Sequence, residues 1–387
     1  MFIRILLLVT TVAHVCAAQS RCDADTAFRS AQNLLAGKQY EQSAKALDGL
    51  RRCATLSNLQ TFEMGWLYGR ARRFDVALEL FGQVPEEVPD RQTHGYAVAL
   101  ARFELSDFPG AIATLTALRA AGFSDPNSTN LLAVAYARLG LYREAYEVLS
   151  NAAAIEPSDL TTWMNLATVC AEGGDFAKAA EVAEKAAQLF PKESEVFVVR
   201  GAASMLLGRV DSAAEDFAVA TQLAPSRADA RFFLALTKYQ RGDFADAVQI
   251  LRSAAKEGIA DSDLHYLTAE CLLKMDPGNT APPLDELKRA IALNSASVPA
   301  RILRGKLLLA NGRAVGAVED LELARKMSPD SRSATYNLAR AYRALGRTAD
   351  AQKLLSGMQA GSENPLVDEI SQERLGKAVL GRGDPAK

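Results

Sequence analysis

Residues 163–191, WMNLATVCAEGGDFAKAAEVAEKAAQLFP, carry the pattern that decides the fold. A first apolar stretch surrounds the small residue Ala167, the pair Gly173-Gly174 follows, and a second Ala-rich stretch ends at Pro191. Glycine permits the positive φ that a tight turn between helices needs. Proline ends a helix at the residue before it. The stretch therefore predicts a hairpin of two helices.

The same pattern recurs every 34 residues along the chain. The small residue of each predicted first helix forms the series Ala31, Gly65, Ala99, Ala133, Ala167, Gly201, Ala235 and Ala269, and then, after a two-residue insertion, Gly305 and Ala339. Two helices approach to ~8 Å only where the side chains at their crossing are small. Larger residues such as Phe81 and Phe217, in the second helices, are expected to pack on the other side of this seam. The period predicts an all-α array of stacked hairpins.

Glycine also recurs at the predicted turn between the two helices of a hairpin, where we expect positive φ. These glycines are Gly140, Gly174, Gly208, Gly242, Gly312 and Gly346. An insertion near residues 276–281 interrupts the period once, and Pro282-Pro283 is expected in the first turn of the helix that follows.

The repeated unit resembles the tetratricopeptide repeat. The residues that match its motif are Trp163, Leu166, Ala167, Cys170, Gly174-Asp175-Phe176, Ala179, Ala186 and Pro191, and again Tyr336-Asn337-Leu338-Ala339, Tyr342 and Gly346. About ten tandem repeats cover residues 24–361, and the resemblance implies a right-handed α-solenoid. Arg200 and Arg304 stand where the motif usually has leucine.

The first 18 residues have the order of a secretory signal peptide. Arg4 precedes the apolar residues 5–15, and the small residues Cys16-Ala17-Ala18 follow. We expect cleavage after Ala18, or one residue to either side, and an exported protein that is periplasmic or secreted. A membrane anchor is the alternative, but the apolar run falls short of the ~20 residues that span a bilayer. Lipidation of Cys16 is a further alternative that Val15, directly before it, disfavours.

At the other end, residues 364–380 predict a C-terminal capping helix, and residues 381–387 a disordered tail.

Export permits disulfide bonds. Cys22 lies just before the first predicted helix and Cys53 at the end of the second, so an antiparallel hairpin brings them together and favours a bridge over two separate thiols. Cys170 and Cys271 fall within helices and are predicted to be small buried residues. Without a Cys-x-x-Cys pair, and with His94 and His265 far apart, we expect no metal site.

Composition and motifs exclude two classes of function. The 44 basic and 46 acidic side chains give a net charge of −2, which argues against a nucleic-acid partner. We find no Gly-x-Ser-x-Gly, His-Glu-x-x-His, Walker or Gly-x-Gly-x-x-Gly motif, so we expect neither an enzyme nor a bound cofactor.

The resemblance implies that the first helices line a concave inner wall through the fifth, ninth and twelfth position of each repeat. Some family members hold acidic C-termini with Lys and Asn residues at these positions of neighbouring repeats. That combination is absent here, and Asn130 alone does not supply it. The candidate partner-binding groove consists of Phe28, Phe62, Trp66, Tyr96, Leu100, Phe103, Phe232, Leu236, Tyr239, Tyr266, Lys306, Tyr336, Arg340 and Arg343. Two alternatives are an inner wall that is mostly packed against itself and a C-terminal helix that folds back into the groove.

Exposed aromatic residues near arginine are typical of binding surfaces. The sequence thus predicts a non-enzymatic exported scaffold that binds a protein or peptide partner in an envelope or extracellular assembly, with no membrane span once the signal peptide is removed. The alternative is an accessory factor for polysaccharide export or for cell-wall or envelope assembly.

Overall fold

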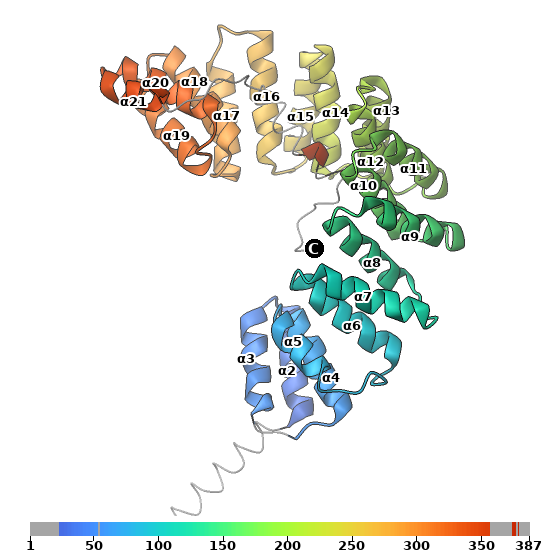
Figure 1. Ribbon diagram of the computed structural model, residues 1–387. Helices are drawn as coiled ribbons and strands as arrows, with labels where there is room; N and C mark the ends of the chain where they lie inside the picture. The colour runs from blue at the N-terminus through green and yellow to red at the C-terminus, as the bar shows by residue number, and fades with distance from the viewer. Residues whose placement is uncertain (1–22, 53–54, 357–373, 377, 379–387) are drawn as a thin grey trace, which may run out of the picture. The chain divides into compact units, whose positions relative to one another are not determined.

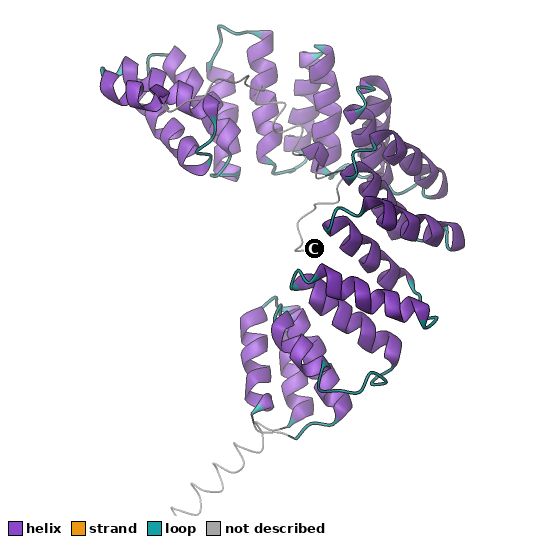
Figure 2. Cartoon of the chain, in the orientation of Figure 1, coloured by secondary structure: helices purple, strands orange, loops and turns teal. Residues whose placement is uncertain are grey.

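The computed structural model describes residues 23–52, 55–356, 374–376 and 378. Within these ranges the chain forms helices and no strands (Figure 2), which confirms the predicted all-α class. The chain divides into two compact units, one that ends at Thr162 and one that begins at Trp163. The predicted signal peptide, Cys22, Cys53 and residues 381–387 lie outside the described residues. Of the predicted capping helix, only residues 374–376 and 378 are described, and these are helical.

Consecutive helices of each unit pack against one another (Figure 1). The first unit contains α2 (Ala24–Ala36), α3 (Tyr40–Arg51), α4 (Asn58–Arg70), α5 (Phe74–Phe81), α6 (Arg91–Glu104), α7 (Phe108–Ala120), α8 (Pro126–Arg138) and α9 (Tyr142–Ile155). Helix α10 (Leu160–Glu172) includes the boundary between the units.

The second unit continues the same alternation. It contains α11 (Phe176–Leu189), α12 (Ser194–Leu206), α13 (Val210–Leu223), α14 (Ala228–Arg241), α15 (Phe244–Lys256), α16 (Ser262–Met275), α17 (Ala281–Leu293), α18 (Val298–Ala310), α19 (Ala314–Met327), α20 (Arg332–Ala344) and α21 (Thr348–Ser356). The insertion forms the loop between α16 and α17, and Pro282 and Pro283 lie in the first turn of α17. None of the helices in the described ranges combines the length and the apolar character that crossing a membrane requires.

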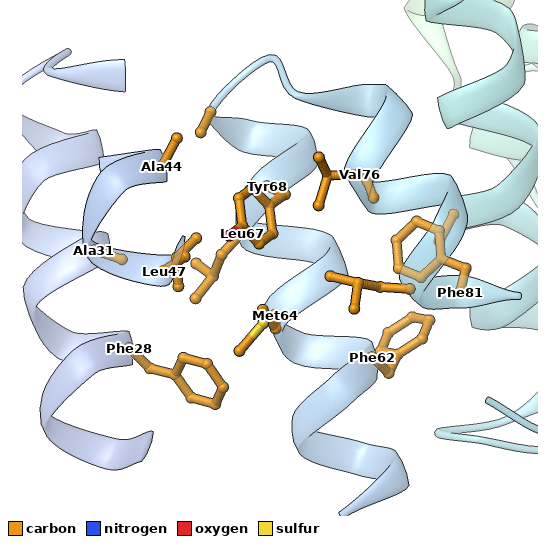
Figure 3. Packing of buried hydrophobic residues seen from close by; sticks show 14 of the residues in the cluster. Phe28, Ala31, Ala44, Leu47, Phe62, Met64, Leu67, Tyr68, Val76 and Phe81 are labelled. Carbon is orange, nitrogen blue, oxygen red and sulfur yellow. The ribbon is translucent and has the colours of Figure 1, made fainter. Parts of the chain in front are cut away.

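The small residues of the 34-residue series lie in the cores of the hairpins. Ala31 is fully buried between α2 and α3, beside Leu47 and near Phe28 (Figure 3). In the next hairpin, a Cβ atom on Gly65 would lie 2.8 Å from Cε1 of Phe81, closer than two carbon atoms approach. The second helix therefore packs directly on the backbone of the first, as the period predicts.

Neighbouring hairpins are also joined by buried polar contacts. The hydroxyl of Tyr68 in α4 is fully buried and donates a hydrogen bond of 2.6 Å to Oδ1 of Asp48 in α3. Tyr342 in α20 donates in the same register to Oε1 of Glu322 in α19, at 2.7 Å. These bonds supply a partner to a phenol that would otherwise be buried alone.

The turn between the two helices of a hairpin contains a residue with positive φ, except in the loop between α16 and α17, which carries the insertion. The predicted glycines confirm this, with φ between 72° and 85°. At the equivalent places in the first three hairpins the chain uses Lys38, Arg72 and Ser106, whose φ values are 56°, 61° and 62°. The backbone geometry is therefore kept even where the residue is not glycine.

The two arginines that depart from the repeat motif form ion pairs within their own hairpins. Nε of Arg200 in α12 donates to Oδ1 of Asp216 in α13 at 2.9 Å, and Nε of Arg304 in α18 lies 2.5 Å from Oδ2 of Asp320 in α19. Both carboxylates are buried and lie 16 residues after their arginine. An arginine–aspartate pair thus replaces an apolar contact at this point of the seam.

Candidate functional site

An apolar cavity opens in the first unit, where α4, α5 and α6 meet. Its volume is about 190 Å³. Its lining includes Trp66 and Gly69 from α4, Phe74 and Phe81 from α5, and Leu100 and Glu104 from α6. Two of the predicted groove residues, Trp66 and Leu100, therefore come together in one cavity.

The local sequence explains why this space stays open. Gly69 has no side chain, and a Cβ atom there would touch Phe74 and Ala77 at an ordinary distance of 3.9 Å. The indole of Trp66 is not withdrawn into the core, since 37% of the residue remains exposed. Arg70 and Glu104 supply opposite charges to an otherwise apolar lining. The cavity thus combines an accessible aromatic ring with two polar groups.

The remaining predicted groove residues of the first unit differ in accessibility. Phe28 and Phe62 are buried, with 4% and 6% of their surface exposed, and they pack in the hydrophobic core (Figure 3). Tyr96 and Phe103 are half-buried. The rings of Phe103 and Phe108 pack in a T-shaped arrangement at a centroid distance of 5.3 Å. Burial raises the pKa of the Tyr96 hydroxyl, and the charge of Asp125 adds to this effect.

In the second unit the predicted apolar anchors are mostly covered. Phe232, Leu236 and Tyr266 are each 1% exposed, and Tyr239 is half-buried with its ring edge-to-face with Phe244. The hydroxyl of Tyr266 donates to Oε1 of Glu270 at 2.9 Å. The predicted residues Phe232, Leu236 and Tyr266 therefore lie within the packed structure.

Glu270 places a carboxyl group beside these aromatic residues. Burial raises its pKa, against the opposing effects of the Tyr266 hydrogen bond and of the positive charges of Lys306 and Lys274.

The predicted basic end of the groove is exposed. Lys306, Arg340 and Arg343 are all accessible, as is Tyr336, which has 49% of its surface exposed. Arg340 makes a hydrogen bond of 3.4 Å from Nη1 to Oδ1 of Asn337 in the same helix.

Sequence reasoning missed the residue that covers Phe232. The guanidinium of Arg374 lies over the Phe232 ring, with Cζ 4.4 Å from the ring centroid. Arg374 also pairs with Asp261 and Asp263 at the start of α16. Because Arg374 lies outside the repeated motif, the 34-residue period gives no sign of this contact.

Cys170 and Cys271 are buried and unpaired, which confirms their predicted placement. Burial raises the pKa of the Cys170 thiol to about 11 and that of Cys271 to about 12. Both thiols are therefore protonated near neutral pH, unlike a reactive cysteine. In the described part of the chain, no group of three or more His, Cys, Asp or Glu side chains is arranged to hold a metal ion.

Comparisons with solved structures find other helical repeat proteins. A tetratricopeptide repeat protein from Parabacteroides merdae is 20% identical, with a TM-score of 0.49, over 65% of this chain and 98% of that one. Yeast Tom70 is 16% identical, with a TM-score of 0.40, over 94% and 97%. YrrB, described as a TPR protein with an unusual peptide-binding site, is 17% identical, with a TM-score of 0.38, over 49% and 96%.

No curated protein matches the sequence. Two family models do. The model of the cilia and flagella-associated protein 70 C-terminal domain matches residues 91–338, more than half of the chain. A tetratricopeptide repeat model matches residues 332–355, which contain α20 and α21. With the repeated hairpins described above, these matches show that the chain belongs to the tetratricopeptide repeat family.

Proposed function

We propose that this protein is a non-enzymatic scaffold that binds a protein or peptide partner, and that the apolar cavity at Trp66 is its main anchoring site. The observation that carries the proposal is an accessible tryptophan at a preformed cavity between three helices. Tryptophan and arginine in such settings contribute most of the binding free energy at protein interfaces. Trp66 and Arg70 both line the cavity.

The size of the cavity fits one apolar side chain of a partner. An enclosed space of about 150 Å³ suffices to hold benzene, and this cavity measures about 190 Å³. An aromatic or branched side chain can therefore enter between Phe74, Phe81 and Leu100. Arg70 and Glu104 are then placed to contact polar groups of the same peptide.

A displayed library of random peptides, selected on the full chain, tests this proposal. We expect enriched peptides to share an aromatic or large aliphatic residue. The Leu100→Asp substitution places a charge in the cavity and should weaken their binding at least tenfold, because the cost of burying an unpaired carboxylate opposes it. Trp66→Ala should also weaken binding, since it removes the aromatic anchor.

The matched control is Leu59→Ala. Leu59 is an exposed apolar residue of the same helix, α4, with 56% of its surface accessible, and it does not line the cavity. Binding should be unchanged in this variant. Selected peptides that bind Leu100→Asp and the original protein equally would refute the cavity as the anchoring site.

We also propose that the scaffold works outside the cytoplasm, in an envelope or extracellular assembly. The sequence of residues 1–18 supports this location. Mass spectrometry of the protein isolated from its native source should find an N-terminus at Gln19, or one residue to either side. An N-terminus at Met1 would contradict export by cleavage.

A further inference from the structure

Arg374 contacts residues that lie more than a hundred positions earlier in the chain. Its Nε donates to Oδ2 of Asp263 at 2.7 Å, and its Nη2 lies 2.7 Å from both carboxylate oxygens of Asp261. In a repeat array each hairpin is expected to contact only its neighbours. Helices α17 to α21 lie between the two partners in sequence. This contact is therefore made by a segment that returns along the array.

The described C-terminal residues lie against α14 and α16, in the second unit. Figure 1 draws them as a short dark red stretch near α14. Leu375 is buried, with 3% of its surface exposed, and the Arg374 side chain is 17% exposed. The segment is thus docked through both an apolar and a charged side chain.

The geometry of the contact is specific for a guanidinium group. Two of its nitrogens, Nε and Nη2, meet the carboxylates of Asp263 and Asp261, while its face covers Phe232. A planar fork with several N–H donors satisfies all three contacts at once, whereas the ammonium of lysine is a point charge that cannot stack in this way. The site therefore discriminates arginine from lysine.

The acidic side of the site is held in place by the fold itself. Asp261 caps α16, since its Oδ1 accepts the backbone N–H of Asp263 at 2.8 Å. Burial would raise the pKa of Asp261, but Arg374 and the capping bonds hold it below its ordinary value. Two carboxylates face one guanidinium, so the site is negative when that guanidinium is absent. This charge attracts a cationic side chain.

We propose that Phe232, Asp261 and Asp263 form a binding site for an arginine side chain of a partner peptide, and that Arg374 fills this site in cis. The C-terminal segment then acts as an internal ligand, which an arginine-bearing partner must displace. This site lies in the second unit and is separate from the cavity at Trp66, so the proposal does not rest on the function proposed above.

Tethering gives the internal ligand an advantage over an external one. A ligand that belongs to the same chain as its site can act at an effective concentration on the order of millimolar. A partner peptide of moderate affinity therefore binds poorly while Arg374 occupies the site. Removal of the Arg374 side chain should expose the site and increase the apparent affinity for such a peptide.

A fluorescent peptide of residues 366–380 tests the proposal by anisotropy with the full chain. We expect saturable binding to the Arg374→Ala protein and binding at least tenfold weaker to the unchanged protein. A peptide in which the same arginine is replaced by Lys should bind the Arg374→Ala protein at least tenfold more weakly than the original peptide. Adding Asp263→Asn to the Arg374→Ala protein should reduce binding of the original peptide by a similar factor.

Two controls separate this site from other effects. Asp211→Asn, in the Arg374→Ala background, changes an exposed aspartate that pairs with Arg241 and should leave binding unchanged. Trp66→Ala in that background should also leave binding unchanged, which distinguishes this site from the cavity. Asp261→Asn is a second test that keeps a capping residue at the start of α16. Far-UV circular dichroism checks that each variant is folded.

Absence of saturable binding to a folded Arg374→Ala protein would overturn the proposal and leave the contact as a fixed structural one. If the peptide binds the Arg374→Ala protein equally well with and without the additional Asp263→Asn substitution, the proposal is overturned as well.

Discussion

A Cβ atom built on Gly201 would lie 2.7 Å from Cε1 of Phe217, a ring that is fully buried in the hairpin of α12 and α13. The same ring stacks on Phe233 of the next hairpin, at a centroid distance of 5.0 Å. A shift of the ring away from Gly201 would therefore disturb this stacked contact. In the same register, Gly65 faces Phe81. In both hairpins, a phenylalanine of the second helix packs against a glycine of the first helix.

Gly201→Ala should destabilise the protein by about 1–3 kcal/mol, the usual cost of overpacking a dense core. Urea unfolding followed by circular dichroism measures the loss. The control is Gly316→Ala in α19, where a Cβ atom meets only Leu308 at 3.5 Å. That change should stabilise the helix by up to about 1 kcal/mol.

Adding Phe217→Leu to Gly201→Ala should recover much of the lost stability. Leu251 follows Ala235 at the same spacing of 16 residues, so this chain already combines alanine and leucine at these two positions in another repeat. A fully tolerated Gly201→Ala would show that the seam is looser than the structure indicates.

Ser106→Gly should stabilise the protein. Ser106 holds φ at 62° in the turn between α6 and α7, a conformation that costs an ordinary residue about 1–2 kcal/mol. Glycine removes this cost, although the greater freedom of the unfolded chain offsets part of the gain, so we expect about 0.5–1 kcal/mol. The midpoint of urea unfolding should rise. Gly140→Ala, at the equivalent turn with φ of 74°, should lower it. Shifts of the same sign in both variants would contradict this explanation.

Arg200→Leu restores the residue that is usual in the repeat, yet it should destabilise this protein. The buried Asp216 side chain, 6% exposed, would lose its positively charged partner. Removing one member of a buried pair costs about 3–5 kcal/mol. Burial already raises the pKa of Asp216, against the effect of Arg200. Without the arginine this pKa should rise further.

The sign of the pH dependence follows from this shift. A carboxyl group whose pKa is higher in the folded state than in the unfolded chain keeps its proton in the folded protein over the pH interval between these two values. The folded state therefore loses stability as the pH rises through that interval. The loss caused by Arg200→Leu should therefore be smaller at about pH 4 than at about pH 7. In a protein that also carries Asp216→Asn, the loss of stability caused by Arg200→Leu should be the same at both pH values. A loss that is the same at both would show that Asp216 is solvated in the variant.

The repeated hairpins could be predicted from sequence because their packing is local. The residues that meet across the seam, such as Gly65 and Phe81, lie a fixed 16 positions apart, so the period records their contact. The positive φ of the turn could be predicted where glycine marks it. It could not be predicted at Lys38 or Arg72, because these residue types do not favour a left-handed backbone and packing imposes it on them.

The candidate site was predicted less completely. The resemblance gives the repeat positions of the predicted groove residues, but the position of a residue in a repeat does not determine whether its side chain is exposed. Trp66 remains partly exposed at a cavity that Gly69 also lines, whereas Phe232 is covered by Arg374. A single arginine outside the period carries no information about which hairpin it contacts. Long-range contacts of this kind need coordinates.

The four cysteines that follow the predicted signal peptide should differ in reactivity. Cys170 and Cys271 are 6% and 0% exposed, and burial holds their thiol pKa values near 11 and 12. We expect no reaction of either with a disulfide reagent in the folded protein near neutral pH. Unfolding in urea without reductant should release these two thiols alone, because Cys22 and Cys53 are predicted to be bridged. Prior reduction should raise the count to four.

Cys53→Ser tests the bridge within the same assay, since it should leave Cys22 free and raise the unreduced count to three. Asp23, next to Cys22, caps the start of α2, and Arg52, next to Cys53, follows the end of α3. Since the two helices form one antiparallel hairpin, these ends adjoin, and a bridge there closes its open end. Loss of the bridge should lower stability by about 3–4 kcal/mol in the chain-entropy account. Four reactive thiols in the unreduced, unfolded protein would refute the pairing, and stability would then be unchanged by replacing both cysteines.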